Sequence, residues 1–458
     1  MIGRLARWFD DRLRASDFAH RALNKVFPDD WSFMLGEIAL YSFVVLVLTG
    51  TFLTFFFVPS AGEIVYRGAY EPLRGVEVSE AYASVLELSF SVRAGLVMRQ
   101  THHWAALVFI GAIVVHLCRV FFTGAFRRPR EVNWMIGLTL LLLALFNGFT
   151  GYSLPDDLLS GTGLRIAYSV ALSIPFVGTW LAFLVFGGEF PTHATIPRLF
   201  VAHVFIVPLV LFALVSIHLA LIWHQKHTQH AGPGRTETNV VGSTLWPTYA
   251  AKSVGLFFAI AAVLGAMGGL LQINPVWLYG PFDAAAVTSP AQPDWYLGWL
   301  EGALRLFPPW ELRVAGHTVA NPFFPGVLLP GVTFLLLYAW PFLEARATGD
   351  RSPHHLLDRP RDHPLRTAIG AAGLTFYGLL FLAASNDVVA KTFAVPVAAV
   401  TVAFQVLVLV LPMLVGVVTF RLMRRLRDSG APDLLQVPFR TPVGAAPPEG
   451  SAARSGAE

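Results

Sequence analysis

Cysteine is almost absent from this chain, which contains only Cys118 among 458 residues. One thiol cannot form an intramolecular disulfide, ligate an iron–sulfur cluster or attach a haem through a Cys-x-x-Cys-His motif. If the protein works with an iron–sulfur centre or a covalently bound haem, that group must belong to another subunit.

Charged residues are also scarce, at 14% of the chain, whereas 55% of the residues are hydrophobic and the mean hydropathy is +0.58. This composition excludes an ordinary water-soluble domain and indicates an integral membrane protein. Eight apolar stretches are long enough to cross a hydrocarbon core of about 30 Å. They lie near 33–57, 101–122, 133–152, 199–222, 251–271, 323–342, 367–385 and 393–420.

Two further segments are predicted to lie outside the bilayer. The apolar run at 166–186 is broken by Pro175 and Gly178, which favours surface helices over a ninth span. Residues 1–32 are charged and amphipathic and have no continuous apolar core before Trp31, so they predict a surface segment and not a cleavable signal peptide.

Basic residues are distributed unevenly between the two sides of the membrane. They cluster before the first span, after the second and sixth spans and at the end of the eighth, whereas the loops 58–97, 153–197 and 272–322 hold few for their length. Because cytoplasmic segments retain Lys and Arg, both termini are predicted to be cytoplasmic. The isoelectric point near 9.3 follows from this asymmetry and requires no nucleic-acid partner.

The hydrophilic stretch 223–250 separates the first four spans from the last four. The sequence therefore predicts an all-α integral membrane protein with a cytoplasmic surface segment at 1–32, an N-terminal four-helix bundle at 33–245 and a C-terminal four-span domain at 246–428. Residues 429–458 are rich in Gly, Ala, Pro and Ser and predict a disordered cytoplasmic tail.

Four histidines fall on two of the apolar helices as matched pairs, His102 with His116 and His203 with His218. Gaps of fourteen and fifteen residues correspond to ~21 and ~22 Å along a helix, with both members on roughly one face. If the helices run side by side in the same direction, His102 meets His203 (the outer pair) and His116 meets His218 (the inner pair). Ionisable groups inside a membrane tend to be functional, and no carboxylates accompany these histidines as in a di-iron bundle. The pattern predicts two haems, each held by two imidazoles.

Glycines on two other spans repeat this spacing. Gly36 with Gly50, and Gly137 with Gly151, have the same separation as His102 with His116. Glycine lets a flat macrocycle approach a helix backbone where any Cβ would collide, although ordinary close helix packing would use glycines in the same way.

Three arginines lie near the ends of the histidine-bearing spans, where haem propionates would need cations. They are Arg99, Arg119 and Arg198. Positive flanking of helix ends is the alternative explanation. His103 adjoins a proposed ligand but points about 100° away from it, so it is not assigned to iron.

Several motifs resemble cytochrome b of the cytochrome bc complexes, over nearly the whole chain. Arg99-Gln-Thr-His-His-Trp104, His116-Leu-Cys-Arg-Val120 and Thr150-Gly-Tyr-Ser-Leu-Pro155 carry the resemblance in the first half. In the second half, Pro293-Asp-Trp-Tyr296 resembles the family's Pro-Glu-Trp-Tyr quinol-site motif. Aspartate stands in place of glutamate, which retracts the carboxyl by about one methylene. Together with Gly151-Tyr-Ser-Leu-Pro-Asp-Asp157, this variant resembles the actinobacterial respiratory type.

The resemblance implies two haems b, a low-potential one ligated by His102 and His203 and a high-potential one ligated by His116 and His218. Pro208 matches the family's proline in the fourth span and is expected to distort that helix locally.

The resemblance also implies two quinone sites. Tyr152, Pro293, Asp294, Trp295 and Tyr296 would form the outer quinol pocket, with Asp294 as the proton acceptor. The inner quinone site is placed less closely by the family pattern.

The inner region holds Trp223, His224, Lys226 and His227, of which either histidine could exchange a proton at neutral pH. An ordinary solvated loop remains the alternative for these four residues.

A chain of this kind is expected to be the cytochrome b subunit of a quinol–cytochrome c oxidoreductase in a bacterial cell membrane. Quinol, which the actinobacterial resemblance makes menaquinol, would give one electron to a Rieske iron–sulfur subunit and the other through the haems to the inner site, with proton translocation. A cytochrome c subunit, a second copy of the complex in a homodimer and a terminal oxidase are the further partners that the resemblance implies.

Three other functions use intramembrane histidines. A di-haem anchor of a dehydrogenase usually needs fewer spans and no acidic quinol motif. A proton-relaying transporter would bind no haem. An oxygen-reducing oxidase subunit would need additional histidines for copper within its spans, and the remaining histidines lie mostly in loops.

Overall fold

The computed structural model describes residues 8, 10–286, 292–314 and 316–430; most of the predicted tail at 429–458 lies outside the described residues. Within them, eight helices are long and apolar enough to cross a membrane, which confirms the predicted all-α, eight-span class. The spanning helices are α3 (Met34–Thr54), α5 (Gly95–Phe122), α6 (Glu131–Tyr152), α9 (Thr195–Val201) continuing through Ala202–Ile206 into α10 (Val207–Gln225), α11 (Ala250–Leu270), α14 (Leu329–Thr348), α15 (Pro364–Ala383) and α17 (Val397–Asp428).

The remaining elements are short. The helices are α2 (Ala15–Leu23), α4 (Glu80–Phe90), α7 (Leu158–Leu172), α8 (Gly178–Phe186), α12 (Val276–Tyr279), α13 (Trp295–Leu306) and α16 (Asn386–Phe393). The strands form two-stranded pairs, β1 (Val26–Phe27) with β5 (Ser243–Thr244), β2 (Glu63–Val65) with β3 (Glu77–Ser79), β4 (Gln229–His230) with β8 (Leu356–Leu357), and β6 (Leu312–Val314) with β7 (His317–Val319).

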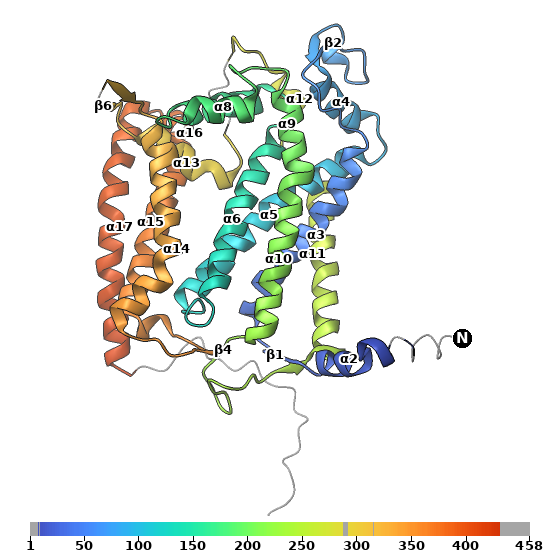
Figure 1. Cartoon of the computed structure of the whole chain (residues 1–458). Coiled ribbons are helices and arrows are strands. Elements are labelled where there is room, and N and C mark those ends of the chain that lie inside the picture. The colour runs from blue at the N-terminus through green and yellow to red at the C-terminus, as the bar shows by residue number, and fades with distance from the viewer. Residues whose placement is uncertain (1–7, 9, 287–291, 315, 431–458) are drawn as a thin grey trace, which may run out of the picture.

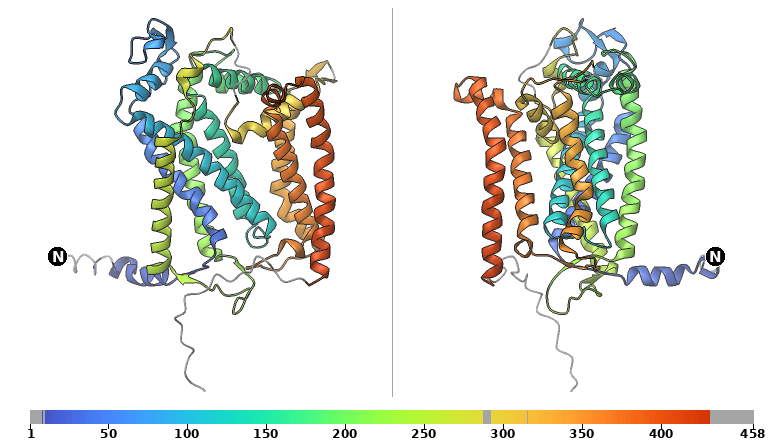
Figure 2. Two further views of the ribbon diagram at one scale, coloured as in Figure 1. Left: turned by 180° about the vertical axis from the view of Figure 1, so that it is seen from behind. Right: turned by 60° about the vertical axis from the view of Figure 1, so that its left-hand side comes forward.

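The spans are arranged around a central bundle of α3, α5, α6 and α10, with α14, α15 and α17 grouped on one side (Figures 1 and 2). The Trp134 indole on α6 donates to the Leu337 carbonyl of α14 at 2.7 Å. Helix α11 packs instead against α3 and α5, where the Trp104 indole donates to the Leu271 carbonyl at 3.0 Å. The boundary predicted at 245/246 therefore divides the sequence but not the packing. The fifth span, α11, packs against helices of the first group.

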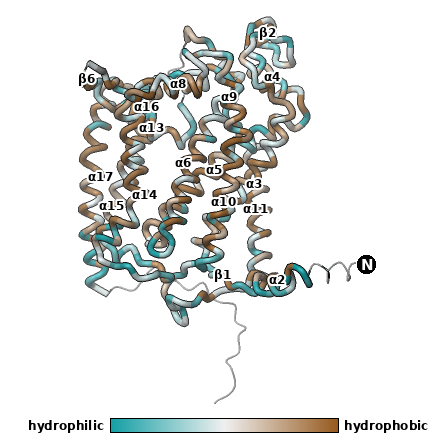
Figure 3. The backbone as a smooth tube through the Cα atoms, viewed as in Figure 1, coloured by the Kyte–Doolittle hydropathy of each residue, from teal (hydrophilic) through white to brown (hydrophobic). Residues whose placement is uncertain are grey.

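Short helices close both ends of the bundle. The apolar run at 166–186 forms α7 and α8, which lie across one end, so the prediction that it does not span is confirmed (Figure 1). At the other end lie α2, the loops after α5 and α14 and the end of α17, and the two loops and the end of α17 are rich in basic residues. We call this end the basic face and the other the opposite face. Figure 3 shows apolar residues along the middle of the spans and hydrophilic segments along the basic face.

Arg130 joins three segments at the basic face. The residue is 7% exposed, and its guanidinium donates to the carbonyls of Gln225, Lys226 and His354 and to Nδ1 of His355. Arg130→Met should therefore destabilise the protein by roughly 1–3 kcal/mol, because it leaves partly buried carbonyl groups without their donor. The measurement is the thermal unfolding midpoint of the purified protein.

The matched control is Arg128→Met, because the Arg128 guanidinium donates to a single exposed carbonyl, that of Arg351. This variant should change stability by no more than about 0.5 kcal/mol. Equal unfolding midpoints for the two variants would show that Arg130 does not hold these segments together.

Candidate functional site

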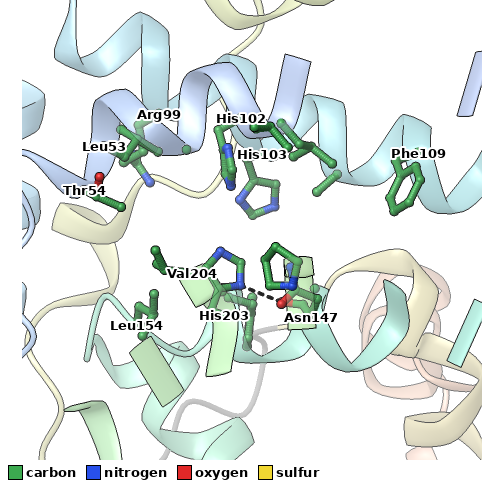
Figure 4. A pocket seen from close by; sticks show the side chains of 18 of the residues that line it. Leu53, Thr54, Arg99, His102, His103, Phe109, Asn147, Leu154, His203 and Val204 are labelled. Carbon is green, nitrogen blue, oxygen red and sulfur yellow. Dashed lines mark hydrogen bonds between the residues drawn. The ribbon is translucent and has the colours of Figure 1, made fainter. Parts of the chain in front are cut away.

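The two rings of the outer pair face each other across the centre of the bundle. His102 on α5 and His203 beside α10 have ring centroids 6.1 Å apart, with the rings inclined at 74° (Figure 4). An iron bound by two imidazole nitrogens at about 2 Å each would place the ring centres roughly 6 Å apart. The spacing of the two rings is therefore that of a shared metal.

Hydrogen bonds orient both rings of the outer pair. His203 Nδ1 donates to the Asn147 carbonyl at 2.9 Å, and His102 Nδ1 lies 3.0 Å from Thr49 Oγ1. A histidine whose Nδ1 is engaged in this way presents Nε2 to a metal. Sequence reasoning missed Thr49 and Asn147, because no spacing rule reveals which group on a neighbouring helix meets a ring.

His203 lies in an irregular turn of its helix. Ala202–Ile206 is a π-helical segment that ends two residues before Pro208, the residue expected to distort this span. Proline has no amide hydrogen to donate to the preceding turn, and π-helical turns often occur at functional sites. The distortion gives His203 a local backbone geometry that a regular helix would not.

Each of the four repeated glycines faces one of the four histidines. A Cβ built on Gly151 would lie 2.3 Å from Cε1 of His203, and one on Gly50 would lie 3.1 Å from Cε1 of His102. The corresponding distance to histidine Cε1 is 3.4 Å for Gly36 with His116 and 3.8 Å for Gly137 with His218. At the outer pair, the imidazoles occupy the space that the side chain of a residue larger than glycine at position 50 or 151 would need.

The inner pair is surrounded by buried polar atoms that find no partner within the described part of the chain. These atoms include Nδ1 of His116 and of His218, Nε and Nη2 of Arg119, and Oδ1 of Asn133. The Arg119 guanidinium lies 4.2 Å from the Phe33 ring centre. A buried cation without an acceptor is costly, so this site suits an anionic group such as a haem propionate.

The other two arginines differ in position. Arg99 lines the outer cavity and donates from Nη2 to the Asn274 carbonyl at 3.0 Å, while its buried Nε finds no acceptor among the described residues. Arg198 is exposed and donates to the carbonyls of Phe183 and Leu184 at the end of α8. The structure thus brings Arg99 to the outer pair, whereas Arg198 caps a surface helix.

A cavity of about 300 Å³ joins the outer pair to the acidic motif. Its lining includes Tyr152, Asp294 and Tyr296 as well as both outer histidines. Burial, followed by the nearby Asp294 charge, raises the pKa of Tyr296 well above its usual value, so this phenol stays protonated at neutral pH. The cavity therefore combines two facing imidazoles, a carboxylate and a phenol donor.

Asp294 directly precedes α13, and both oxygens of its carboxylate are engaged. Oδ1 lies 2.8 Å from Nε2 of His103, and Oδ2 accepts from the Tyr296 hydroxyl at 3.2 Å. Trp295 turns toward α5, where its Cζ2 would lie 3.5 Å from a Cβ on Gly111, and Pro293 is half-buried beside it. The partnership with His103 was not foreseen, since the sequence shows only that its side chain points away from His102.

The four inner quinone-site candidates are only partly brought together. The His227 ring lies 4.7 Å from Phe27, whose ring is 6.1 Å from Trp223. Burial, reinforced by neighbouring cations, lowers the pKa of His227 to about 4, so it is neutral at pH 7. His224 and Lys226 are exposed.

A second cluster near the basic face was missed from the sequence. Glu37 on α3 accepts hydrogen bonds from Tyr249 and, at 2.9 Å, from Ser253. Tyr249 stacks on Phe27 with ring centroids 4.5 Å apart, which links this carboxylate to the ring that contacts His227. A lone carboxylate within a span was the available signal.

The fold and the site define a class: a multi-pass α-helical membrane protein with one pair of facing histidines, a second pair of glycine-faced histidines on the same two spans, and an acidic cavity beside the first pair. Residues 107–281 match a family model described as Cytochrome b(N-terminal)/b6/petB. The cytochrome bc1 complex cytochrome b subunit of Mycobacterium tuberculosis is 54% identical over 422 residues, which are 92% of this chain and 77% of that protein.

Two other relatives carry the same name. That of Corynebacterium diphtheriae is 49% identical, covering 92% of this chain and 78% of the relative, and that of Streptomyces coelicolor is 48% identical, covering 93% and 79%. The chain belongs to the family of cytochrome b subunits of cytochrome bc1 complexes. It is thus an electron-transport component, and the dehydrogenase anchor, the transporter and the oxidase subunit are set aside.

The fold is also similar to a solved structure. A chain of a hyperthermophilic respiratory Complex III aligns with a TM-score of 0.66 and 21% identity, covering 91% of this chain and 98% of that chain. The resemblance at this identity concerns the arrangement of the helices.

Proposed function

We propose that this subunit oxidises quinol in the cavity beside His102 and His203 and returns one of the two electrons to quinone near the basic face. The observation that carries the proposal is the shared lining of one cavity by the outer histidine pair and by Asp294. Together with the glycines that face each ring and the buried arginine atoms without acceptors, this geometry fits haem b at both pairs.

His102 and His203 would hold the low-potential haem b, and His116 and His218 the high-potential one. When bound, the two haems supply a one-electron path between the faces of the membrane, with potentials set partly by ligands and burial. Arg99 and Arg119 offer cations to propionates, and the glycines keep the helix backbones clear. Arg198 would hold no propionate, because its guanidinium donates to the end of α8.

At the outer site, the chain's own groups manage the quinol and its protons. Asp294 accepts a quinol proton, while Tyr152 and Tyr296, 7% and 2% exposed, wall the cavity against water. Because the Tyr296 phenol stays protonated, it can donate a hydrogen bond to the carboxylate throughout. Pro293 fixes the entry to α13, and Trp295 anchors that helix on α5.

At the basic face, the proposed inner site includes Trp223, His224, Lys226 and His227. His227, neutral at pH 7, offers a ring nitrogen to a quinol hydroxyl, and the exposed His224 and Lys226 lie toward the aqueous phase. Protons would enter here and leave at the opposite face.

The same proposal sets the orientation and the partners. The basic face would be cytoplasmic, with both termini inside the cell membrane of a bacterium. Because one cysteine cannot supply the acceptor of the first electron, a Rieske subunit and a cytochrome c subunit are proposed, in a homodimeric complex that can associate with a terminal oxidase. The actinobacterial relatives favour menaquinol as the substrate.

Asp294→Asn tests the outer site. The amide removes the proton acceptor but keeps the shape, so quinol oxidation should fall by roughly 10²-fold, the usual size of general-base effects. The assay is quinol-dependent cytochrome c reduction by the purified complex, with the haem b content measured beside it. Full activity in Asp294→Asn with normal haem content would remove Asp294 from the reaction.

A further inference from the structure

We infer that His103 is a positioning residue that fixes the Asp294 carboxylate, and that this pair takes the place of the longer acid typical of the family motif. The inference rests on the proposed function. His103 Nε2 lies 2.8 Å from Asp294 Oδ1, and the two side chains are 13% and 15% exposed. At this distance and burial, the contact is stronger than one at an open surface.

The position of His103 on α5 explains how one helix can present both a proposed haem ligand, His102, and the residue that positions Asp294. Successive residues of a helix point about 100° apart, so His102 can face His203 while His103 faces α13. Both rings line the same cavity, and Figure 4 shows both rings there. The carboxylate is therefore fixed to the same helix turn that carries an outer ligand.

The two oxygens of Asp294 are held from opposite elements. His103 on α5 engages Oδ1, and the Tyr296 hydroxyl on α13 donates to Oδ2. A carboxylate held at one oxygen can rotate about its last torsion, whose energy wells are broad. Two contacts remove that freedom and keep the acceptor at one place in the cavity.

The length of the acid matches the reach of the histidine. One more methylene would advance the carboxyl by about 1.5 Å, which exceeds the slack in a contact already 2.8 Å long. Glutamate at position 294 would therefore collide with His103 or turn away from it. A smaller residue at position 103 would make room for glutamate, so the structure predicts that the two substitutions compensate each other.

The experiment uses the assembled complex and four sets of variants. His103→Gln keeps a donor near the Nε2 position, whereas His103→Asn carries the same amide one methylene too short. His103→Ala, Asp294→Glu and their double variant form a cycle. His193→Leu, an exposed histidine on the opposite face, is the control. For each variant, kcat and KM for quinol are measured, with haem b content and reduced-minus-oxidised spectra.

The expected result is a roughly tenfold loss of kcat in His103→Ala, His103→Asn and Asp294→Glu, at little change in KM. His103→Gln should retain about half of the activity or more, since it preserves the hydrogen bond. The double variant should exceed both of its single variants by about threefold or more, as coupled neighbours do.

Other outcomes would overturn the inference. Multiplicative losses in the double variant would show that the residues act independently, and equal activity of His103→Gln and His103→Asn would show that the donor position does not matter. A variant that loses haem b has a damaged site and is left out of the comparison. The remaining variants then decide whether His103 positions Asp294. A wild-type complex without haem b or quinol turnover would instead contradict the proposed function.

Discussion

Replacing His102 or His218 with leucine is expected to leave one haem b per chain and to abolish steady-state quinol turnover. Each substitution removes one imidazole from one pair, and the two pairs face different glycines at different depths of the bundle. The loss should exceed the roughly hundredfold effect that removal of a supporting hydrogen bond to a metal ligand can have. Pyridine haemochrome analysis and a redox titration of each purified variant measure the outcome.

The two variants should lose different components of the titration. His102→Leu should remove the low-potential component, and His218→Leu the high-potential one. His193→Leu, at an exposed position, should keep both. Retention of two haems in either ligand variant would mean that the paired residues do not bind iron.

Adding a single methyl group at Gly151 should be nearly as damaging as removing a ligand. A Cβ there would lie 2.3 Å from Cε1 of His203, closer than real Cβ atoms approach, so the imidazole must move and the outer haem should be lost. The measurement is the haem b content of Gly151→Ala beside its spectrum.

Gly265→Ala is the control. Gly265 lies on the spanning helix α11, which carries none of the four histidines, and a Cβ there would meet nothing within 4 Å, so both haems should remain. Equal haem loss in both variants would point to general disruption of the bundle, and no loss in either would show that the outer ring has room to move.

The spans were predictable because the bilayer imposes a length and a composition on any helix that crosses it. The pairing of histidines with glycines was visible for a similar reason, since a regular helix turns spacing into position. Gly50 and Gly151, proposed from spacing, face the outer histidines in the structure.

Packing between distant segments was not predictable. The return of α11 to the first group depends on contacts such as the Trp104 hydrogen bond, which no local pattern encodes. Arg198 looked like Arg99 in the sequence, yet its guanidinium binds the end of α8. The partnership of His103 with Asp294 joins residues 191 positions apart.

At the outer site, the length of the Asp294 side chain matches the reach of His103. The actinobacterial relatives are similar across most of the chain, so this arrangement of short acid and histidine can be compared directly among purified complexes. We expect the acid to stay near the outer pair because α5 carries both His102 and His103, which contacts the acid.

The most direct test of haem binding by both histidine pairs is the haem b content of the wild-type protein, measured as the pyridine haemochrome. A redox titration of the reduced-minus-oxidised spectrum accompanies it. Two haems b per chain with two distinct midpoint potentials are expected. One haem, or none, in intact folded protein would contradict this expectation.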